Sequence, residues 1–204
     1  MKRLPLIPTI VVGAAIALMI ALGLWQLDRR AGKEALLARY ASNDALPVIA
    51  FPLGAANDSL LFRTARLDCA SPGDWSREGG RAADGSNGYR HIATCANGAV
   101  VELGIANDPA QPAPDWAGGP VTGTITYAPD PTPVVQRMLG GGGDRRLMLV
   151  ASEPAPGLKA SRRPDPSGIP NNHLAYAVQW FLFAGIAGII YLLALRRRGR
   201  SGLG

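Results

Sequence analysis

The chain has 204 residues, of which 21 are Lys or Arg and 15 are Asp or Glu, so its formal net charge is +6. Residues 28–173 hold 15 cations and 15 anions, so the six remaining cations (21 − 15 = 6) all lie at the two ends of the chain. A neutral middle without a basic stripe is untypical of nucleic-acid-binding proteins, and we expect no nucleic acid as a partner.

Residues 4–27 form the first of two long apolar runs and follow the cations Lys2 and Arg3. As a helix this run would extend about 36 Å, against about 30 Å for the hydrocarbon core of a bilayer. A cleaved signal peptide is the alternative, but its apolar region usually has about 7–15 residues. We therefore predict a cytoplasmic tip at 1–3 and a retained transmembrane helix at 4–27. The lack of an Arg- and Ser-rich presequence favours a bacterial inner membrane.

Residues 28–40 are rich in Ala, Leu, Arg, Lys and Glu, which are good helix formers. The first helix is therefore expected to continue past the membrane. Ser42, Asn43 and Asp44, followed by Pro47, predict its end.

The middle of the chain then reads as short strands separated by turns. Asn97-Gly98, between two such strands, is a strong hairpin signal. Residues 71–88 are rich in Gly, Ser and Arg and predict a mobile hairpin loop, whereas 134–139 predict one or two helical turns. We expect a mainly antiparallel β domain, either a small sheet or a partly open barrel. Its strands are predicted at 61–69, 89–95, 99–105, 121–127 and 146–151.

The chain returns to the membrane through a proline-rich segment, 153–170, which predicts an extended tether. The second apolar run, 174–195, is long enough to span a bilayer and precedes a basic tail at 196–204. Because basic residues flank both runs on their terminal sides, the positive-inside rule predicts two cytoplasmic termini. The domain at 28–173 is then periplasmic.

Cys69 and Cys95 are the only cysteines. Outside the cytoplasm such a pair often forms a disulfide, but two free thiols remain an alternative, and a metal or redox role is a weaker one because no metal-binding spacing is present. The chain carries no nucleophile elbow, phosphate-binding loop or zinc-binding motif, and Gly140 with the three glycines after it reads as a flexible turn. We therefore expect that the protein is not an enzyme.

Polar and aromatic residues gather at the outer ends of the two spans. Helical spacing places Gln26 and Arg29 on one face of the first helix, and His173, Tyr176 and Trp180 on one face of the second. Interfacial anchoring of the aromatic rings is the simpler interpretation, but an amide within an apolar span needs a partner. Small residues repeat every four positions, so we expect the spans to pack closely as a hairpin. These repeats are Gly13, Ala17 and Ala21 in the first span, and Ala184 and Gly188 in the second.

Both outer ends resemble known motifs of the surfeit locus protein 1 family. Residues 23–33 read GLWQLxRxxxK, and residues 171–181 read NNHLxYAxxWF. Gly88-Tyr89, with Thr94 after it, is similar to a strand of the same family. The domain departs from the family pattern where Cys95 replaces a proline, and where an arginine–glycine–tryptophan segment is reduced to Gly104.

The resemblance implies an assembly factor for cytochrome c oxidase, which helps haem a enter subunit I or stabilises that subunit. It implies oxidase subunit I, other assembly factors and the lipid bilayer as partners. His173 is the candidate axial ligand or haem contact. The other candidate haem-binding residues are Trp25, Gln26, Arg29, Tyr176 and Trp180. A scaffold that holds subunit I without binding haem is the alternative.

Overall fold

The computed structural model describes residues 5–130, 132–140 and 145–200. The expected tip at 1–3, the end of the basic tail and the glycines at 141–143 lie outside these residues. The chain divides into two compact units, one formed by Met1–Leu37 with Ile169–Gly204 and the other by Ala38–Gly168.

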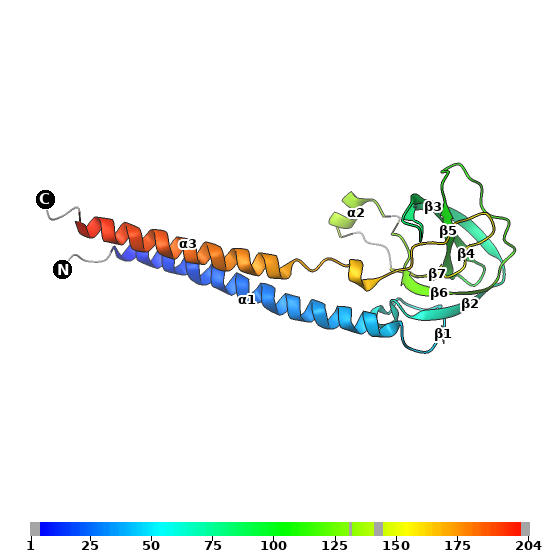
Figure 1. Ribbon diagram of the computed structural model, residues 1–204, viewed down its shortest axis with the longest axis horizontal. Coiled ribbons are helices and arrows are strands. Elements are labelled where there is room, and N and C mark those ends of the chain that lie inside the picture. Colours follow the sequence, from blue (N-terminus) through cyan, green and yellow to red (C-terminus); the bar gives the residue numbers. More distant parts are fainter. Residues whose placement is uncertain (1–4, 131, 141–144, 201–204) are drawn as a thin grey trace. The chain divides into compact units, whose positions relative to one another are not determined.

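Two long apolar helices form the first unit. They are α1 (Leu6–Asn43) and α3 (His173–Arg200), which lie side by side and antiparallel (Figure 1). Their most apolar stretches have mean hydropathies of 2.4 and 2.1, and only 6% of each stretch is buried. Apolar side chains on nearly every outward face are what a lipid environment requires. The prediction of two helices able to cross a membrane, one before and one after a β domain in the chain, is confirmed.

Helix α1 continues well beyond its apolar part. Its 38 residues correspond to a length of about 57 Å, nearly twice the hydrocarbon thickness. Arg30 and Glu34 form an ion pair (2.7 Å) on its charged stretch. At its end, the side-chain amide of Asn43 donates to the backbone oxygens of Ser59 and Leu61, both at 2.8 Å. The predicted continuation and end of this helix are therefore correct.

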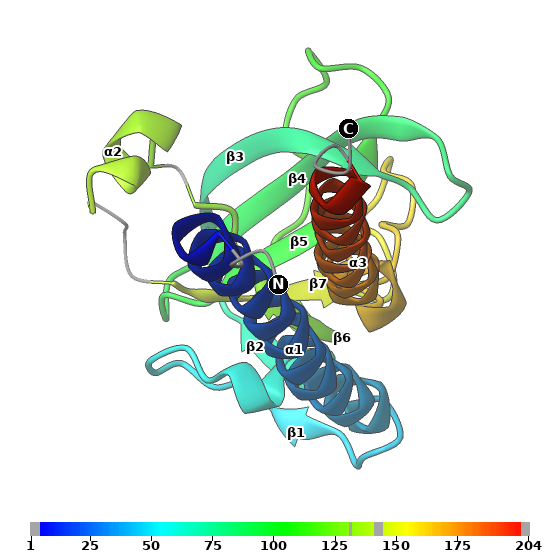
Figure 2. The same ribbon diagram turned by 90° about the vertical axis from the view of Figure 1, so that its left-hand side faces the viewer.

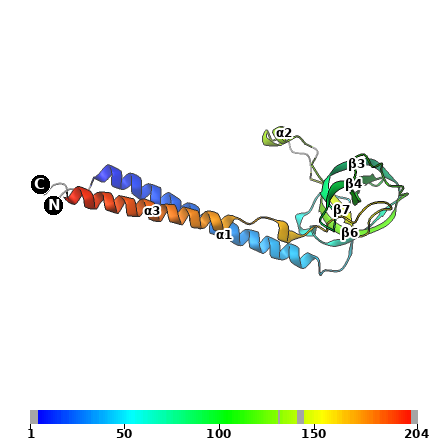
Figure 3. The ribbon, with the colours of Figure 1, turned by 45° about the horizontal axis from the view of Figure 1, so that its top comes forward.

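The second unit is one seven-stranded sheet, in the order β1-β2-β6-β7-β5-β4-β3 (Figure 2). Neighbouring strands are antiparallel except for β1–β2 and β5–β7, so the sheet is mainly antiparallel, as predicted. Figure 3 shows how strongly it curves. The strands are β1 (Ile49–Ala50), β2 (Thr64–Cys69), β3 (Pro72–Arg81), β4 (Asn87–Cys95), β5 (Val100–Ala106), β6 (Gly119–Tyr127) and β7 (Leu147–Ala151).

The sheet curves because only two residues connect β2 to β3 on the far side of the sheet, and a disulfide between Cys69 and Cys95 locks the same point. The disulfide joins the end of β2 to the end of β4, and three strands lie between these two in the sheet. In a flat sheet, four steps of about 4.8 Å would separate them by about 19 Å. The two Cα atoms are 5.4 Å apart, so the sheet curls until its distant strands meet at this end. The disulfide closes a loop of 26 residues, which stabilises the fold by about 3.5 kcal/mol in the chain-entropy account.

Strands β5 and β7 form the centre of the core and are buried along their whole lengths. The β4–β5 hairpin turns at Asn97-Gly98, as predicted. Gly98 has a φ of +81°, and the side-chain oxygen of Asn97 accepts from the backbone N–H of Ala99 (3.2 Å). Because positive φ is accessible to glycine at little steric cost, this dipeptide sets the turn.

Residues 71–88, predicted to be a mobile loop, instead provide the edge strand β3. Its register with β4 runs from Pro72 opposite Cys95 to Arg81 opposite Asn87. Most of its side chains are exposed, so the alternation of apolar and polar residues that reveals a half-buried strand is missing. The prediction was wrong because an edge strand needs no apolar face to be held by main-chain pairing.

Residues 153–168 pack onto the domain and do not form the extended tether predicted at 153–170. The backbone of Lys159 exchanges two hydrogen bonds with that of Ile105, and Ala155 and Leu158 are buried. The segment crosses β5 at Gly104, where an added Cβ would lie 2.7 Å from the backbone oxygen of Lys159. The glycine retained from the family pattern is therefore required by this close approach.

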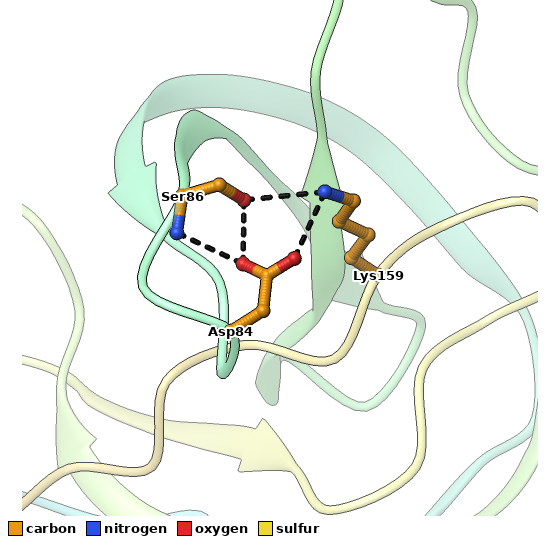
Figure 4. A network of polar contacts seen from close by, with 3 residues as sticks. All are labelled: Asp84, Ser86 and Lys159. Atoms are coloured by element: carbon orange, nitrogen blue, oxygen red, sulfur yellow. Dashed lines mark hydrogen bonds and ion pairs between the residues drawn. The ribbon is translucent and has the colours of Figure 1, made fainter.

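A small polar network joins this segment to the β3–β4 turn (Figure 4). The carboxylate of Asp84 accepts from the backbone N–H and the hydroxyl of Ser86, at 2.8 and 2.6 Å, and pairs with Lys159 at 3.0 Å. The two hydrogen bonds from Ser86, then the one from Lys159, hold the pKa of Asp84 well below its usual range. The charged carboxylate is thus favoured in the folded state.

This network predicts a defined acid sensitivity. Because the folded-state pKa of Asp84 is depressed, its contribution is present above the unfolded pKa of about 3.9 and is lost as the pH falls further. Asp84→Asn should lower the melting temperature at pH 6, as measured by circular dichroism. It should also reduce the fall in melting temperature between pH 6 and pH 3. Asp115→Asn, an exposed aspartate in the same domain, serves as the control. An acid response of Asp84→Asn equal to that of the wild type would contradict the assignment.

Candidate functional site

The facing surfaces of α1 and α3 form a regular seam within the first unit. The less exposed positions on each helix recur at spacings that alternate between three and four residues, the pattern of coiled-coil packing. On α1 they include Thr9, Val12, Ile16, Met19, Gly23 and Gln26. On α3 they include His173, Ala177, Trp180, Ala184, Ala187 and Tyr191, with Phe181 and Gly188 beside them.

The two helices pack tightly at Gly23. A Cβ added there would lie 2.6 Å from the ring of Phe181, so the ring occupies the space that a side chain would fill. Gly13, by contrast, has nothing within 4 Å of its added Cβ. The predicted close packing is therefore present, but on α1 it uses Gly23 and not the repeat of Gly13, Ala17 and Ala21, which is exposed. On α3 the predicted small residues do face α1: Ala184 is buried and Gly188 lies near Ile16.

The seam brings together two of the predicted site residues, Gln26 and His173. The imidazole Nδ1 of His173 lies 2.8 Å from the side-chain Oε1 of Gln26. Because this oxygen can only accept, Nδ1 carries the hydrogen and donates it. In the neutral ring the lone pair is then on Nε2, which is the form that metal-binding histidines adopt. Gln26 thus fixes both the orientation of the ring and the nitrogen that is available to a ligand.

The remaining predicted residues do not all join this pair. The guanidinium of Arg29 lies over the Trp25 ring, 5.7 Å from its centre, on an exposed part of α1. Trp180 makes an edge contact with Phe183, with the ring centres 6.2 Å apart, and Tyr176 is 52% exposed. The structure therefore contains a fixed Gln26–His173 pair and a separate Trp25–Arg29 pair.

Asn171 is a further polar residue, two positions before His173 in the sequence. Its side-chain Oδ1 is buried and has no hydrogen-bond partner among the described residues. A buried polar atom without a partner is rare in folded proteins and is satisfied when a ligand or water donates to it. The imidazole and this oxygen give the start of α3 one free lone pair and one free acceptor. The imidazole nitrogen is a metal-ligand type, whereas the amide oxygen can only accept a hydrogen from a ligand or water.

The second histidine, His91, is a core residue of β4. It is 1% exposed, and burial, with a smaller effect of Arg77, lowers its pKa. A neutral imidazole enclosed by the sheet contributes to packing.

Two apolar helices, each long enough to cross a membrane, carry a histidine–glutamine pair between them and precede and follow a β domain in the chain, which is the architecture of a membrane protein. A model of the SURF1 family matches residues 13–185, which begin within α1 and end within α3. The chain belongs to the SURF1 family, whose role is in cytochrome c oxidase assembly. None of the individually curated proteins compared with the chain matches it.

The contact at Gly23 predicts a selective packing defect. Gly23→Val should force Phe181 away and destabilise the helix pair by about 1–3 kcal/mol, the usual cost of overpacking. Thermal unfolding in detergent measures this effect, and Phe181→Ala in the same chain should recover part of it. Gly13→Val, at an open position, is the matched control. Equal destabilisation by the two valine variants would show that the helices do not pack at Gly23.

Proposed function

We propose that this protein assists the delivery of haem a to subunit I of cytochrome c oxidase, or stabilises that subunit while haem a is inserted. Membership of the SURF1 family supports the oxidase as the target. The observation that carries the haem step is the hydrogen bond from His173 to Gln26, because it leaves Nε2 as a positioned lone pair at the end of the seam. Haem a is the cargo in this proposal and is held transiently.

Each candidate residue has a distinct role in the proposal. His173 binds the haem iron through Nε2, and Gln26 holds the ring in place. Arg29, over the exposed Trp25, pairs with a haem propionate through its planar guanidinium. Tyr176 and Trp180 contact the edge or face of the macrocycle, as aromatic rings do at such sites.

A scaffold that holds subunit I without touching haem is the second candidate. It is favoured by the tight seam, in which Ala177 and Ala184 are buried, and by the apolar outer faces of both helices. Such faces can pack against lipid or against the helices of another membrane protein. In that case the His173–Gln26 hydrogen bond only fixes the register of the pair.

The two candidates predict different spectra. The protein would be expressed in cells that make haem a, purified in detergent and examined by visible absorption. We expect bound haem in the wild type, its loss in His173→Ala, and an affinity about tenfold to a hundredfold lower in Gln26→Ala. Gln179→Ala, an exposed glutamine of α3, is the matched control for Gln26→Ala and should retain the wild-type spectrum.

A colourless wild type would contradict the haem proposal and favour the scaffold. Haem retained by His173→Ala with an unchanged spectrum would show that another residue binds the iron. Co-purification of subunit I with the wild type and with His173→Ala separates the two functions. A scaffold would hold subunit I through the outer faces of its helices and would not require the imidazole.

We further infer a bacterial inner membrane with both termini in the cytoplasm and the β domain in the periplasm. The basic residues that flank both spans on their terminal sides support this orientation. The disulfide supports it as well, since such bonds persist in oxidising compartments. Other oxidase assembly factors would then meet the protein on the periplasmic side.

Reporter fusions test this orientation. A reporter that is active only in the periplasm should be active when fused after Gly168 and inactive when fused after Arg200. A reporter active only in the cytoplasm should give the opposite result at both points. The reverse pattern would overturn the orientation inferred from charge.

A further inference from the structure

A polar cleft in the β domain gathers four arginines that the proposed function does not use. The cleft has a volume of about 330 Å³ and lies where the end of β3 and strands β4, β5, β6 and β7 meet the segment 162–168. Its arginines are Arg81, Arg90, Arg162 and Arg163. They come from three separate parts of the chain, so the fold assembles the cluster.

Three of the arginines, Arg81, Arg90 and Arg163, are held in place while part of each guanidinium stays free. Nε of Arg81 donates to the side chain of Asn87 (3.3 Å), and Nε of Arg90 donates to the backbone oxygen of Gly79 (3.1 Å). Nε of Arg163 donates to the hydroxyl of Thr124 (3.2 Å), and its Nη2 pairs with Asp44. Among the described contacts, none takes either Nη atom of Arg81 or of Arg162. Anchored guanidinium groups lose little entropy when they bind a ligand.

The acidic residues around the cleft neutralise only part of this cluster. Glu102 is 4% exposed, and its carboxylate lies 3.4 Å from Nη1 of Arg90. Burial raises the pKa of Glu102, against the smaller lowering effects of Ser161 and Arg90. Asp165 is exposed, and the hydroxyl and backbone N–H of Ser167, with a smaller effect of the nearby Arg162, lower the pKa of its carboxyl. The cleft therefore keeps an excess of positive charge.

This excess is local and not a property of the whole domain. Residues 38–168 contain 12 Lys or Arg and 13 Asp or Glu, so the domain is slightly acidic. Four of the 12 cations of this domain therefore lie around one cleft, so positive charge is concentrated there. Clefts lined by one sign of charge attract ligands of the opposite sign.

We propose that this cleft is a docking site for an acidic segment of a protein partner, whose Asp or Glu carboxylates bind the free ends of Arg81 and Arg162. The guanidinium fork matches a carboxylate in bidentate geometry. Phosphate sites usually add a cradle of backbone N–H groups or a helix N-terminus, and side-chain forks dominate the described lining here. The partner chemistry is therefore that of an acidic peptide.

Binding of a labelled acidic peptide to the full chain in detergent tests the proposal. The probe is a six-residue peptide of alternating Glu and Gly, with a Gln and Gly peptide as its neutral counterpart, and fluorescence anisotropy is the readout. We expect the acidic peptide to bind and the neutral one not to bind. Arg81→Gln with Arg162→Gln should weaken binding at least about tenfold, because charge-assisted hydrogen bonds are lost.

The control is Arg66→Gln, which removes an exposed arginine of β2 outside the cleft and should bind as the wild type does. Thermal unfolding of each variant confirms that the fold is kept, and Arg162→Lys should weaken binding because it retains the charge without the fork. Equal weakening by Arg66→Gln, or equal binding of the two peptides, would overturn the proposal. Binding of inorganic phosphate without any binding of the peptide would also overturn it and assign the cleft to small anions. None of these outcomes depends on haem.

Discussion

The bond between Cys69 and Cys95 joins the ends of two strands that three other strands separate in the sheet. Only Ala70 and Ser71 connect β2 to the edge strand β3, so the chain itself brings distant strands of the sheet together at this point, and the disulfide locks the strongly curved sheet that results. The curvature encloses the side chains of β5 and β7, and it lets residues 153–168 pass over β5 at Gly104. The same segment then supplies Arg162 and Arg163 to the arginine cleft and Lys159 to the network with Asp84.

The two ends of the helix seam are marked by polar contacts across otherwise apolar surfaces. Thr9 meets the hydroxyl of Tyr191 at 2.5 Å near one end, and Gln26 meets His173 at the other. Dispersion between apolar helices specifies their register weakly in lipid, whereas a hydrogen bond forms at one register only. Gly23 and Phe181 add a steric constraint between them. The histidine is thus held by a register that three separate contacts determine.

Much of this arrangement could be predicted from the sequence. Half-buried strands such as β2 alternate in polarity and are visible, whereas the exposed edge strand β3 and the proline-rich segment carry no such alternation. Helical spacing identified the face that bears His173. It could not pair that residue with Gln26, because the register across two helices depends on the fit of Gly23 against Phe181, which has no signature within either helix. The arginines of the cleft lie as much as 82 positions apart (Arg81 to Arg163), so no local sequence pattern predicts that they form a cluster.

The order of the strands in the sheet differs from their order of synthesis. Strands β6 and β7 lie between β2 and β5, although the chain makes them after both. Until β6 and β7 have been made, nothing pairs with the facing edges of β2 and β5. Both cysteines, 26 positions apart, have been made by then. The last strands must therefore enter a gap in a partly built sheet. In a chain that ended after β5, the strands β2 and β5 would each keep an unpaired edge, and the core would be incomplete. The sheet can close only after β7 has been made, and α3 follows β7 in the chain.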